Sequence, residues 1–161
     1  MTGGGGTPPP RDGRGYDPQM PLGTPEIDFI QANPSAAMIT VGADGFAKPV
    51  RVAVAVVDGK LWSSGTQQRA RTARLRADPR CTLYVHDTGW SFLTLEATVT
   101  ILEGPEVPAA SLALFRVMQG RESGPVTWNG VELAEPDFLQ AMIDDDRLIY
   151  QFEVGRTYGM Y

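Results

Sequence analysis

Apolar and polar residues alternate along several short segments of this chain, which is the pattern of β-strands with one buried face. The clearest case is Lys48–Val57, in which every second residue from Val50 to Val56 is a valine and the residues between are small or charged. Ser91–Leu102 alternates in the same way, as the wall of a half-buried barrel would. The pattern predicts six strands in all: Ala37–Val41, Lys48–Val57, Lys60–Ser63, Cys81–His86, Ser91–Leu102 and Leu148–Val154.

Proline and glycine separate these strands and bound four predicted helices. Thr24 and Pro25 suit the cap and the first position of a helix that Pro34 ends. Asp58-Gly59 is a hairpin signal, and Gly120–Glu132 is expected to be a polar loop. The predicted helices are Thr24–Asn33, Arg69–Ala77, Pro108–Met118 and a segment that begins near Pro136. This order predicts a mainly β fold with flanking helices, built on a small six-stranded antiparallel barrel.

The first 23 residues differ in composition from the rest of the chain. Met1–Gly23 holds runs of glycine and proline and has almost no apolar residues to bury. Such a segment cannot offset the entropy that it would lose on ordering, so we predict a flexible N-terminal arm over residues 1–23. Residues 24–161 are long enough for one domain with a single core.

Overall composition excludes several classes of function. The net charge of −5 and the isoelectric point near 4.8 argue against a protein that binds bulk nucleic acid. The longest apolar run, Val52–Val57, is far shorter than the ~20 residues of a membrane span, and no signal-peptide pattern is present. With Cys81 and His86 as the only cysteine and histidine, an internal disulfide and an ordinary zinc site are excluded. We therefore expect a cytoplasmic protein with no nucleic-acid or membrane partner and no metal site.

Positive charge is concentrated in one stretch of this acidic chain. Ser63–Arg80 contains five arginines, which follow hydroxyl side chains and a glycine. Its first two arginines fall where the second helix is expected to begin, and free N–H groups and the helix dipole favour an anion there. Arginine adds bidentate contacts to phosphate. The stretch therefore predicts a phosphate site that includes Ser64, Gly65, Thr66, Arg69 and Arg71.

The five arginines cannot all serve one ligand. On a helix, Arg69, Arg76 and Arg80 lie near one meridian, with Arg71 and Arg74 roughly opposite. We interpret Arg74, Arg76 and Arg80 as helix surface, with Arg80 paired to Asp78 or a neighbour.

Other residues that could carry chemistry give weaker signals. His86 could ligate haem iron, although a lone histidine is more often structural. Cys81 is interpreted as a buried strand cysteine. Asp144–Asp146 are interpreted as solvated carboxylates or partners of Arg147, and Trp128 as either a cover over a cleft or a docked loop aromatic. No histidine is placed to activate a serine or cysteine, and no G-x-G-x-x-G motif supports dinucleotide binding.

The segment RARTARLRADPR, followed by CTLYVHD and GWSFLTLEATVTIL, resembles the pyridoxamine 5'-phosphate oxidase-like split-barrel superfamily. Within it, the chain is most similar to the actinobacterial flavin/deazaflavin oxidoreductases that use coenzyme F420. Members carry a basic-x-basic pair before an N-L-R-x-D-P-R run. Here the pair is Arg69 and Arg71, and the run is Arg74–Arg80 with arginine in place of the asparagine. The segment QAMIDDDRLIYQFEVGRTYGM resembles the family's closing helix, strand and tail, so the likeness spans Ile27–Gly159.

This resemblance implies a split β-barrel of the FMN-binding type and a homodimer with two cofactors in clefts between the subunits. It assigns Arg69 and Arg71 to the cofactor phosphates. It also implies that Ser64, Thr66 and Thr72 form hydrogen bonds around those phosphates.

The same resemblance places the second strand beside the cofactor ring, through Pro49, Val52 and Ala53. It implies that Trp90 and Phe92 reach this ring from the other subunit. An aromatic side chain can stack on a flat ring, and small side chains such as Ala53 leave room for one. Simple core packing in a narrow barrel explains the small residues equally well.

The main hypothesis is a cytoplasmic, homodimeric oxidoreductase that binds reduced coenzyme F420 and passes hydride to a small organic acceptor. No side chain is identified as a proton donor, and Arg51 and Tyr84 are candidate contacts of the acceptor. Two alternatives stay open: an FMN-dependent oxidoreductase of the same fold, and a non-catalytic protein that binds haem or a flavin.

Overall fold

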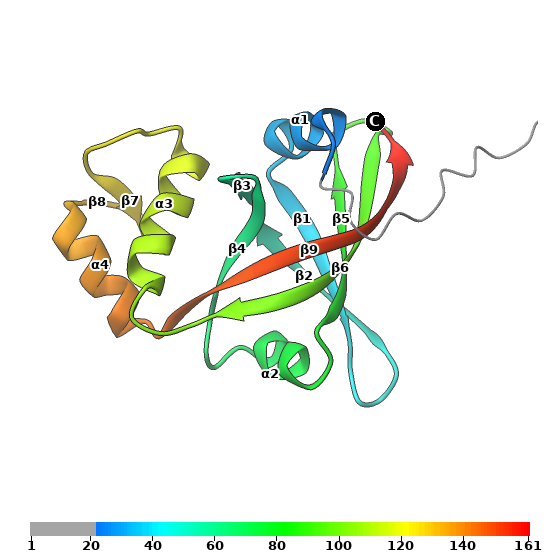
Figure 1. The fold of residues 1–161 in the computed structure, drawn as a ribbon, viewed down its shortest axis with the longest axis horizontal. Coiled ribbons are helices and arrows are strands. Elements are labelled where there is room, and N and C mark those ends of the chain that lie inside the picture. Colours follow the sequence, from blue (N-terminus) through cyan, green and yellow to red (C-terminus); the bar gives the residue numbers. More distant parts are fainter. Residues whose placement is uncertain (1–21) are drawn as a thin grey trace, which may run out of the picture.

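The computed structural model describes residues 22–161 (Figure 1). Most of the predicted N-terminal arm, residues 1–21, lies outside the described residues. The elements in chain order are α1 (Thr24–Ala32), β1 (Ser35–Val41), β2 (Ala47–Ala53), β3 (Ala55–Val57), β4 (Lys60–Thr66), α2 (Ala70–Ala77), β5 (Arg80–His86), β6 (Phe92–Leu102), α3 (Val107–Gln119), β7 (Val126–Trp128), β8 (Val131–Leu133), α4 (Glu135–Asp144) and β9 (Arg147–Met160).

The main sheet is antiparallel throughout and has the strand order β2-β1-β5-β6-β9-β4-β3. Its two outermost strands, β2 and β3, are parts of one predicted strand that is interrupted at Val54. The N–H group of Val54 donates to the carbonyl of Pro34 instead of to a sheet neighbour. Because one chain segment serves both ends of the sheet, the sheet curls until β2 contacts β4. The predicted antiparallel split barrel is confirmed, with seven strands in place of six because of this interruption.

Two other sequence predictions need correction. The predicted polar loop Gly120–Glu132 contains the hairpin β7–β8, whose turn is formed by Asn129 and Gly130 with positive φ angles of 49° and 80°. This is the pair of residues that a tight hairpin turn favours, but strands of three residues are too short to show alternation. Gly23, and not Thr24, is the N-cap of α1, and no side chain caps that helix.

Apolar side chains from the inner faces of the strands fill the barrel. Met38, Leu83 and Leu95 are fully buried in this core. Ile30 of α1 and Leu75 of α2 belong to this core. Figure 1 shows these two helices at opposite ends of the barrel. The two helices therefore close the barrel at both ends.

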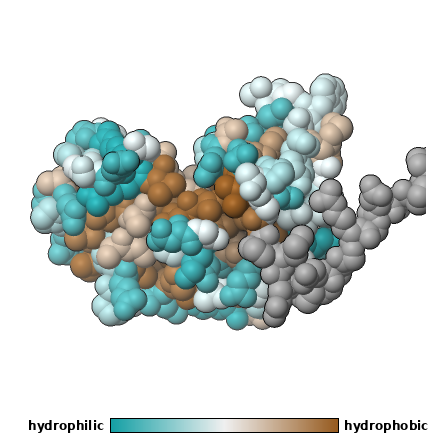
Figure 2. Space-filling view, turned by 45° about the horizontal axis from the view of Figure 1, so that its top comes forward, coloured by the Kyte–Doolittle hydropathy of each residue, from teal (hydrophilic) through white to brown (hydrophobic). Residues whose placement is uncertain are grey.

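Between β6 and β9 the chain forms a separate layer made of α3, β7, β8 and α4, here called the α3–α4 unit (Val107–Asp144). It has its own buried cluster, which consists of Leu112, Val126, Phe138 and Met142. A second cluster joins it to the outer face of the barrel, where Leu114 packs with Ile149. Figure 2 shows apolar surface in the hollow between this unit and the barrel.

The β4–β9 pair contains one contact that tolerates only a glycine. A Cβ atom built on Gly65 would lie 2.5 Å from the Cε2 atom and from the hydroxyl oxygen of Tyr150, which is fully buried. Real Cβ atoms do not come that close to a ring, so the ring occupies the space that any side chain at position 65 would need. Gly65 is therefore explained by packing against Tyr150.

We predict that Gly65→Ala destabilises the protein by about 1–3 kcal/mol, because overpacking forces the Tyr150 ring from its place. Urea denaturation gives the free energy of unfolding. Gly155→Ala in β9 is the control, since its Cβ would meet only the carbonyl oxygen of Glu96, at 3.9 Å. Equal stability of the two variants would contradict the packing argument.

The β7–β8 hairpin is fixed by an ion pair whose strength depends on pH. The Nη1 and Nη2 atoms of Arg121 donate to the two carboxylate oxygens of Glu132 at 2.8 and 2.7 Å, and the Thr127 hydroxyl donates to the same carboxylate. The hydrogen bonds from Arg121, and then from Thr127, lower the pKa of Glu132 from 4.5 to about 2. A carboxylate with a lowered pKa stabilises the fold above its unfolded pKa and loses that effect as pH falls.

We predict that Glu132→Gln is less stable than the wild type by a constant amount above pH 4.5, and that the difference narrows as pH falls towards 2. The effect is modest, because the pair is exposed. Urea denaturation at a series of pH values measures it. Glu122→Gln, an exposed change in the same loop, is expected to show no such narrowing.

Candidate functional site

The predicted phosphate-binding stretch begins at the end of β4 and continues into α2. Arg69 is the N-cap of α2 and is exposed. Thr72 is fully buried beneath it, and its hydroxyl donates to the carbonyl of Thr66 at 2.7 Å. Because this hydroxyl has one proton, the Tyr150 hydroxyl at 2.5 Å is the donor of the second bond. The resemblance assigns Thr72 to the phosphate. In the structure, its hydroxyl connects the start of α2 to the end of β4.

An arginine from the far end of the chain joins this stretch. The β4–β9 register places Arg147 opposite Thr66, and the Nη1 atom of Arg147 donates to the Ser64 hydroxyl at 3.4 Å. Arg71 is half-buried, with its guanidinium 5.7 Å from the centre of the Tyr150 ring. The site therefore combines Ser64, Thr66, Arg69, Arg71 and Arg147.

Positive charge at this site is poorly compensated by the described residues. Neither Arg69 nor Arg71 forms a side-chain hydrogen bond or ion pair with any of them, and the Nε atoms of Arg71 and Arg147 are buried without a partner. The carboxylate that approaches Arg147 is that of Asp145, at 3.5 Å. Burial lowers the pKa of Arg147, Asp145 opposes this shift, and the charges of Arg69 and Arg71 add to it. Such a cluster favours an anion with several oxygen acceptors.

The three later arginines of the stretch all have partners within the fold. The Nε atom of Arg74 donates to the Thr40 hydroxyl at 2.8 Å and so connects α2 to β1. Arg76 pairs with Glu103 at 2.9 Å, and Arg80 pairs with Asp78 at 2.7 Å. The Asp78 partner predicted for Arg80 is confirmed. Arg74, Arg76 and Arg80 therefore stabilise the fold through these partners. The side chains of Arg69 and Arg71 have no such partner among the described residues.

The residues assigned to the ring separate on the two faces of β2. Pro49 and Ala53 are exposed on the outer face, whereas Val52 is 6% exposed and belongs to the barrel core. A ligand outside the barrel can contact Val52 only through its backbone. Pro49 and Arg51 line a hollow of about 620 Å³, and Arg51 donates from Nε to the Ser35 hydroxyl at 2.9 Å. This volume lies within the range of small-molecule sites, about 300–1,000 Å³.

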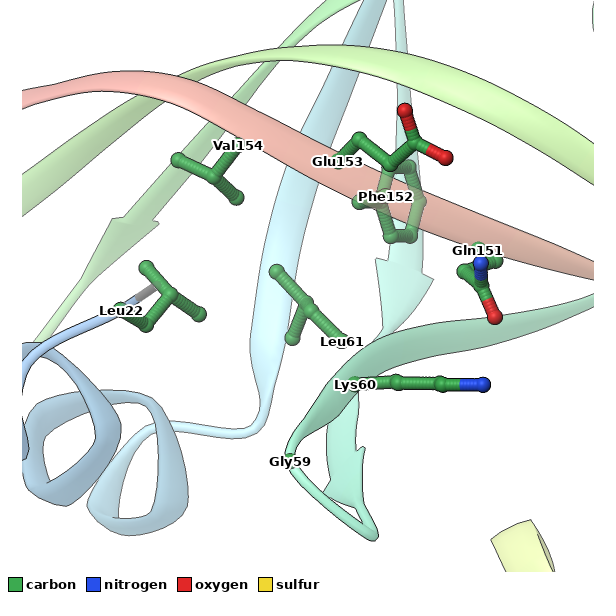
Figure 3. A pocket seen from close by; sticks show the side chains of 8 residues that line it. All are labelled: Leu22, Gly59, Lys60, Leu61, Gln151, Phe152, Glu153 and Val154. Carbon is green, nitrogen blue, oxygen red and sulfur yellow. The ribbon is translucent and has the colours of Figure 1, made fainter. Parts of the chain in front are cut away.

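A second hollow, shown in Figure 3, lies between the segment before α1, the β3–β4 turn and β9. Leu22, Leu61 and Val154 contribute apolar surface, while Lys60 and Glu153 are charged. Its volume is about 170 Å³, which is below the range of small-molecule sites, about 300–1,000 Å³. It includes none of the predicted site residues.

Exposed aromatic residues lie at the turn between β5 and β6. Trp90 is 90% exposed at this turn, which is held by Asp87 through bonds from the N–H groups of Gly89 and Ser91. Phe92 stacks on Tyr84 with ring centres 5.7 Å apart. Trp90 therefore projects away from its own barrel.

Two other candidates from the sequence, Cys81 and Trp128, pack against the rest of the fold. Cys81 is 7% exposed, and burial raises the pKa of its thiol to about 12, so it is the buried strand cysteine that was predicted. Trp128 is half-buried and packs edge-on against Phe115 and Phe138. Across residues 22–161, no group of three or more His, Cys, Asp and Glu side chains could hold a metal ion. Within that same range, no helix is long and apolar enough to cross a membrane.

Sequence reasoning missed the position of Arg147 beside the predicted phosphate site. It treated Arg147 only as a partner of the aspartates before it. The ion pair with Asp145 exists, but the guanidinium also lies beside Ser64 on a neighbouring strand. A signal was present in the alternation of β9, which puts Arg147 on the opposite face from Leu148 and Tyr150.

Comparison with solved structures shows the same fold in several proteins. A conserved hypothetical protein from Mycobacterium tuberculosis is 24% identical, with 86% of this chain and 84% of that chain covered and a TM-score of 0.66. An F420 reductase is 20% identical, with 80% and 93% covered and a TM-score of 0.59. A protein related to general stress protein 26 from Clostridium acetobutylicum is 18% identical, with 82% of each chain covered and a TM-score of 0.57.

The family comparison covers most of the chain. A model described as pyridoxamine 5'-phosphate oxidase matches residues 26–157, which include six of the seven barrel strands, most of β9 and both arginine-bearing segments of the site. The curled antiparallel barrel and the basic start of α2 agree with this match. The chain therefore belongs to the pyridoxamine 5'-phosphate oxidase family.

Proposed function

We propose that this protein is an oxidoreductase that binds coenzyme F420 by its phosphate and transfers hydride to a small organic acceptor. The observation that carries the proposal is the cluster of arginines at the start of α2, in which Arg69 and Arg71 have no ionic partner among the described residues. The fold is shared with an F420 reductase, and the family match supports redox chemistry with a flavin-type cofactor. FMN is the alternative cofactor, because its phosphate would suit the same residues.

The donor set fits a phosphate. Arg69 and Arg71 supply charged N–H donors, and Ser64 and Thr66 supply hydroxyls on the adjoining strand. The orphaned Nε atom of Arg71 is a buried donor whose desolvation is uncompensated unless an acceptor binds. N–H groups at the start of α2 add to the positive potential.

The protein would position a ring beside β2 and leave hydride transfer to the cofactor. When bound, F420 or FMN supplies the hydride chemistry. Pro49 and Ala53 offer exposed, small side chains on the outer face, and the hollow that Pro49 lines has room for an acceptor. Arg51 lines that hollow and is held by Ser35, so it would orient an acceptor that carries an anionic or carbonyl group.

We also propose that the protein acts as a homodimer in the cytoplasm. Tyr84, Phe92, Tyr158 and Met160 lie on one face of β5, β6 and β9, where the register pairs Phe92 with Met160 and connects Tyr84 to Tyr158 through Thr94. Tyr158 and Met160 are 47% and 58% exposed, which leaves an apolar patch open. A second copy would cover this patch, and Trp90 would then reach the partner's cofactor.

Cofactor binding tests the main proposal. Purified protein is titrated with F420, FMN and haem, and fluorescence and absorbance are followed. We expect saturable binding of F420, and we expect Arg69→Ala combined with Arg71→Ala to weaken it by roughly 2–5 kcal/mol, the worth of lost charge-assisted contacts.

The matched control is Arg76→Ala combined with Arg80→Ala, which removes the same charge from the same region but from arginines that already have partners. This control should bind F420 as the wild type does. Saturable binding of FMN alone would favour the flavin alternative. A haem Soret band that disappears in His86→Ala would favour the non-catalytic alternative, since His86 lines the hollow near Pro49.

Dimer formation has a separate test in light scattering after gel filtration. We expect the wild type to have twice the chain mass and Met160→Glu to shift it towards the monomer, because a charge would be buried in the interface. Val131→Glu is the control, since Val131 is equally exposed at 58% but lies on the β7–β8 hairpin. A monomeric wild type at micromolar concentration would refute the dimer.

A further inference from the structure

We propose that Arg147 is a third anion-binding residue, which contacts the phosphate of the bound cofactor directly, and that Trp128 of the β7–β8 hairpin positions it. The inference rests on the proposed function for the identity of the ligand. It goes beyond that function because it makes the α3–α4 unit part of the binding site.

Arg147 is held beside the arginine cluster by three weak contacts. Its guanidinium lies 4.3 Å from the centre of the Trp128 ring, a cation–π contact. Its Nη1 atom is 3.4 Å from the Ser64 hydroxyl, and its Nη2 atom is 3.5 Å from the carboxylate of Asp145. Both distances are longer than the 2.7–2.9 Å of a strong charge-assisted bond. Only 16% of the Arg147 side chain is exposed.

A cation buried to this degree normally has a close anionic partner. Arg116 shows such a partner, because its Nη2 atom pairs with Glu135 at 2.9 Å, although its Nε atom is also buried without a hydrogen bond. Arg147 is more buried, has no comparable partner, and lies near Arg69 and Arg71, which carry the same charge. The fold therefore holds this guanidinium at a cost that an oxyanion beside Ser64 would offset.

Trp128 is placed to fix the direction of Arg147. Its ring packs at 84° to Phe115 and at 86° to Phe138, with ring centres 5.2 and 6.3 Å apart. The aromatic cluster leaves the outer face of Trp128 against the guanidinium. Because neighbouring rings hold Trp128 in place, its contact with the guanidinium orients a long, flexible side chain.

The chemical class of ligand follows from the number of donors. Three guanidinium groups offer more N–H donors than one carboxylate can accept, whereas a phosphate presents several charged oxygens. The structure therefore assigns the site to the phosphate of a cofactor. A ligand that has the same ring but no phosphate should not depend on Arg147.

The test measures dissociation constants for F420 and FMN and for the ring compound of each without its phosphate, riboflavin in the case of FMN. We expect Arg147→Gln to weaken the phosphorylated cofactor that the wild type binds by about 10- to 100-fold and to leave its unphosphorylated counterpart within about twofold. Arg147→Lys should recover part of the loss, because it restores the charge without the fork.

Arg156→Gln is the matched control, since Arg156 is on the same strand and its nearest carboxylate, that of Glu96, is 3.9 Å away at the surface. It should bind the phosphorylated cofactor as the wild type does. The proposal is overturned if Arg147→Gln also binds that cofactor like the wild type. It is also overturned if Arg147→Gln weakens the phosphorylated cofactor and its unphosphorylated counterpart by the same factor.

Failure of the proposed function has a different signature. If the wild type binds neither F420 nor FMN, thermal unfolding is compared in inorganic phosphate and in chloride at equal ionic strength. A rise in Tm with phosphate that Arg147→Gln loses and Arg156→Gln keeps would support the anion site without the cofactor. No rise in the wild type would overturn both.

The role of Trp128 is tested in the wild type and in the Arg147→Gln variant. Trp128→Leu should weaken the phosphorylated cofactor in the wild type and have no further effect on its affinity in Arg147→Gln, because the two residues act through one contact. Trp128→Phe keeps an aromatic face and should restore most of the affinity. Equal losses in the two backgrounds would show that Trp128 does not act through Arg147.

Discussion

The antiparallel pairing of β4 with β9 is the interaction on which both the barrel and the candidate site depend. On its inner face, Gly65 leaves room for the ring of Tyr150. On its outer face, the same register sets Arg147 beside Ser64. A slip by one residue would exchange the two faces and bury a guanidinium in the core. The packing of Tyr150 against Gly65 therefore fixes the strand register that places Arg147 on the opposite face of the sheet.

The arginines of this acidic protein differ in whether a partner compensates their charge. Within the segment that contains α2, Arg76 and Arg80 have close carboxylate partners, and Arg74 is bonded to β1. The arginines at its start have none among the described residues. A local positive potential therefore persists in a chain of net charge −5. Surplus acidic groups elsewhere would also discourage anions from binding away from this site.

Sequence patterns predicted the fold well because each strand of the barrel carries its alternation within itself. The break at Val54 was not predictable in this way, because a valine there continues the alternation of Lys48–Val57. It results from a change of partner strand, which only the closed barrel reveals. The β7–β8 hairpin was missed because three residues are too few to show a period.

The candidate site was predictable where its residues are neighbours in sequence. Ser64–Arg71 is one such run, and the structure places both Ser64 and Arg71 near Arg147. Arg147 is distant in sequence and joins them through strand register, a relation that local patterns do not contain. Val52 shows the reverse case, since its alternation indicated the inner face, where the structure places it, although the resemblance assigned it to a ligand.

The place at which the α3–α4 unit is inserted has a consequence for how such proteins diversify. The chain leaves the barrel after Leu102 and returns at Arg147, and Leu102 pairs with Ile149 across neighbouring strands. A segment whose ends already meet can change in length and sequence without altering loop closure in the barrel. The unit also has its own buried cluster. Replacement of the α3–α4 unit could therefore change ligand preference while the barrel stays the same. Trp128 is the residue through which this unit contacts Arg147.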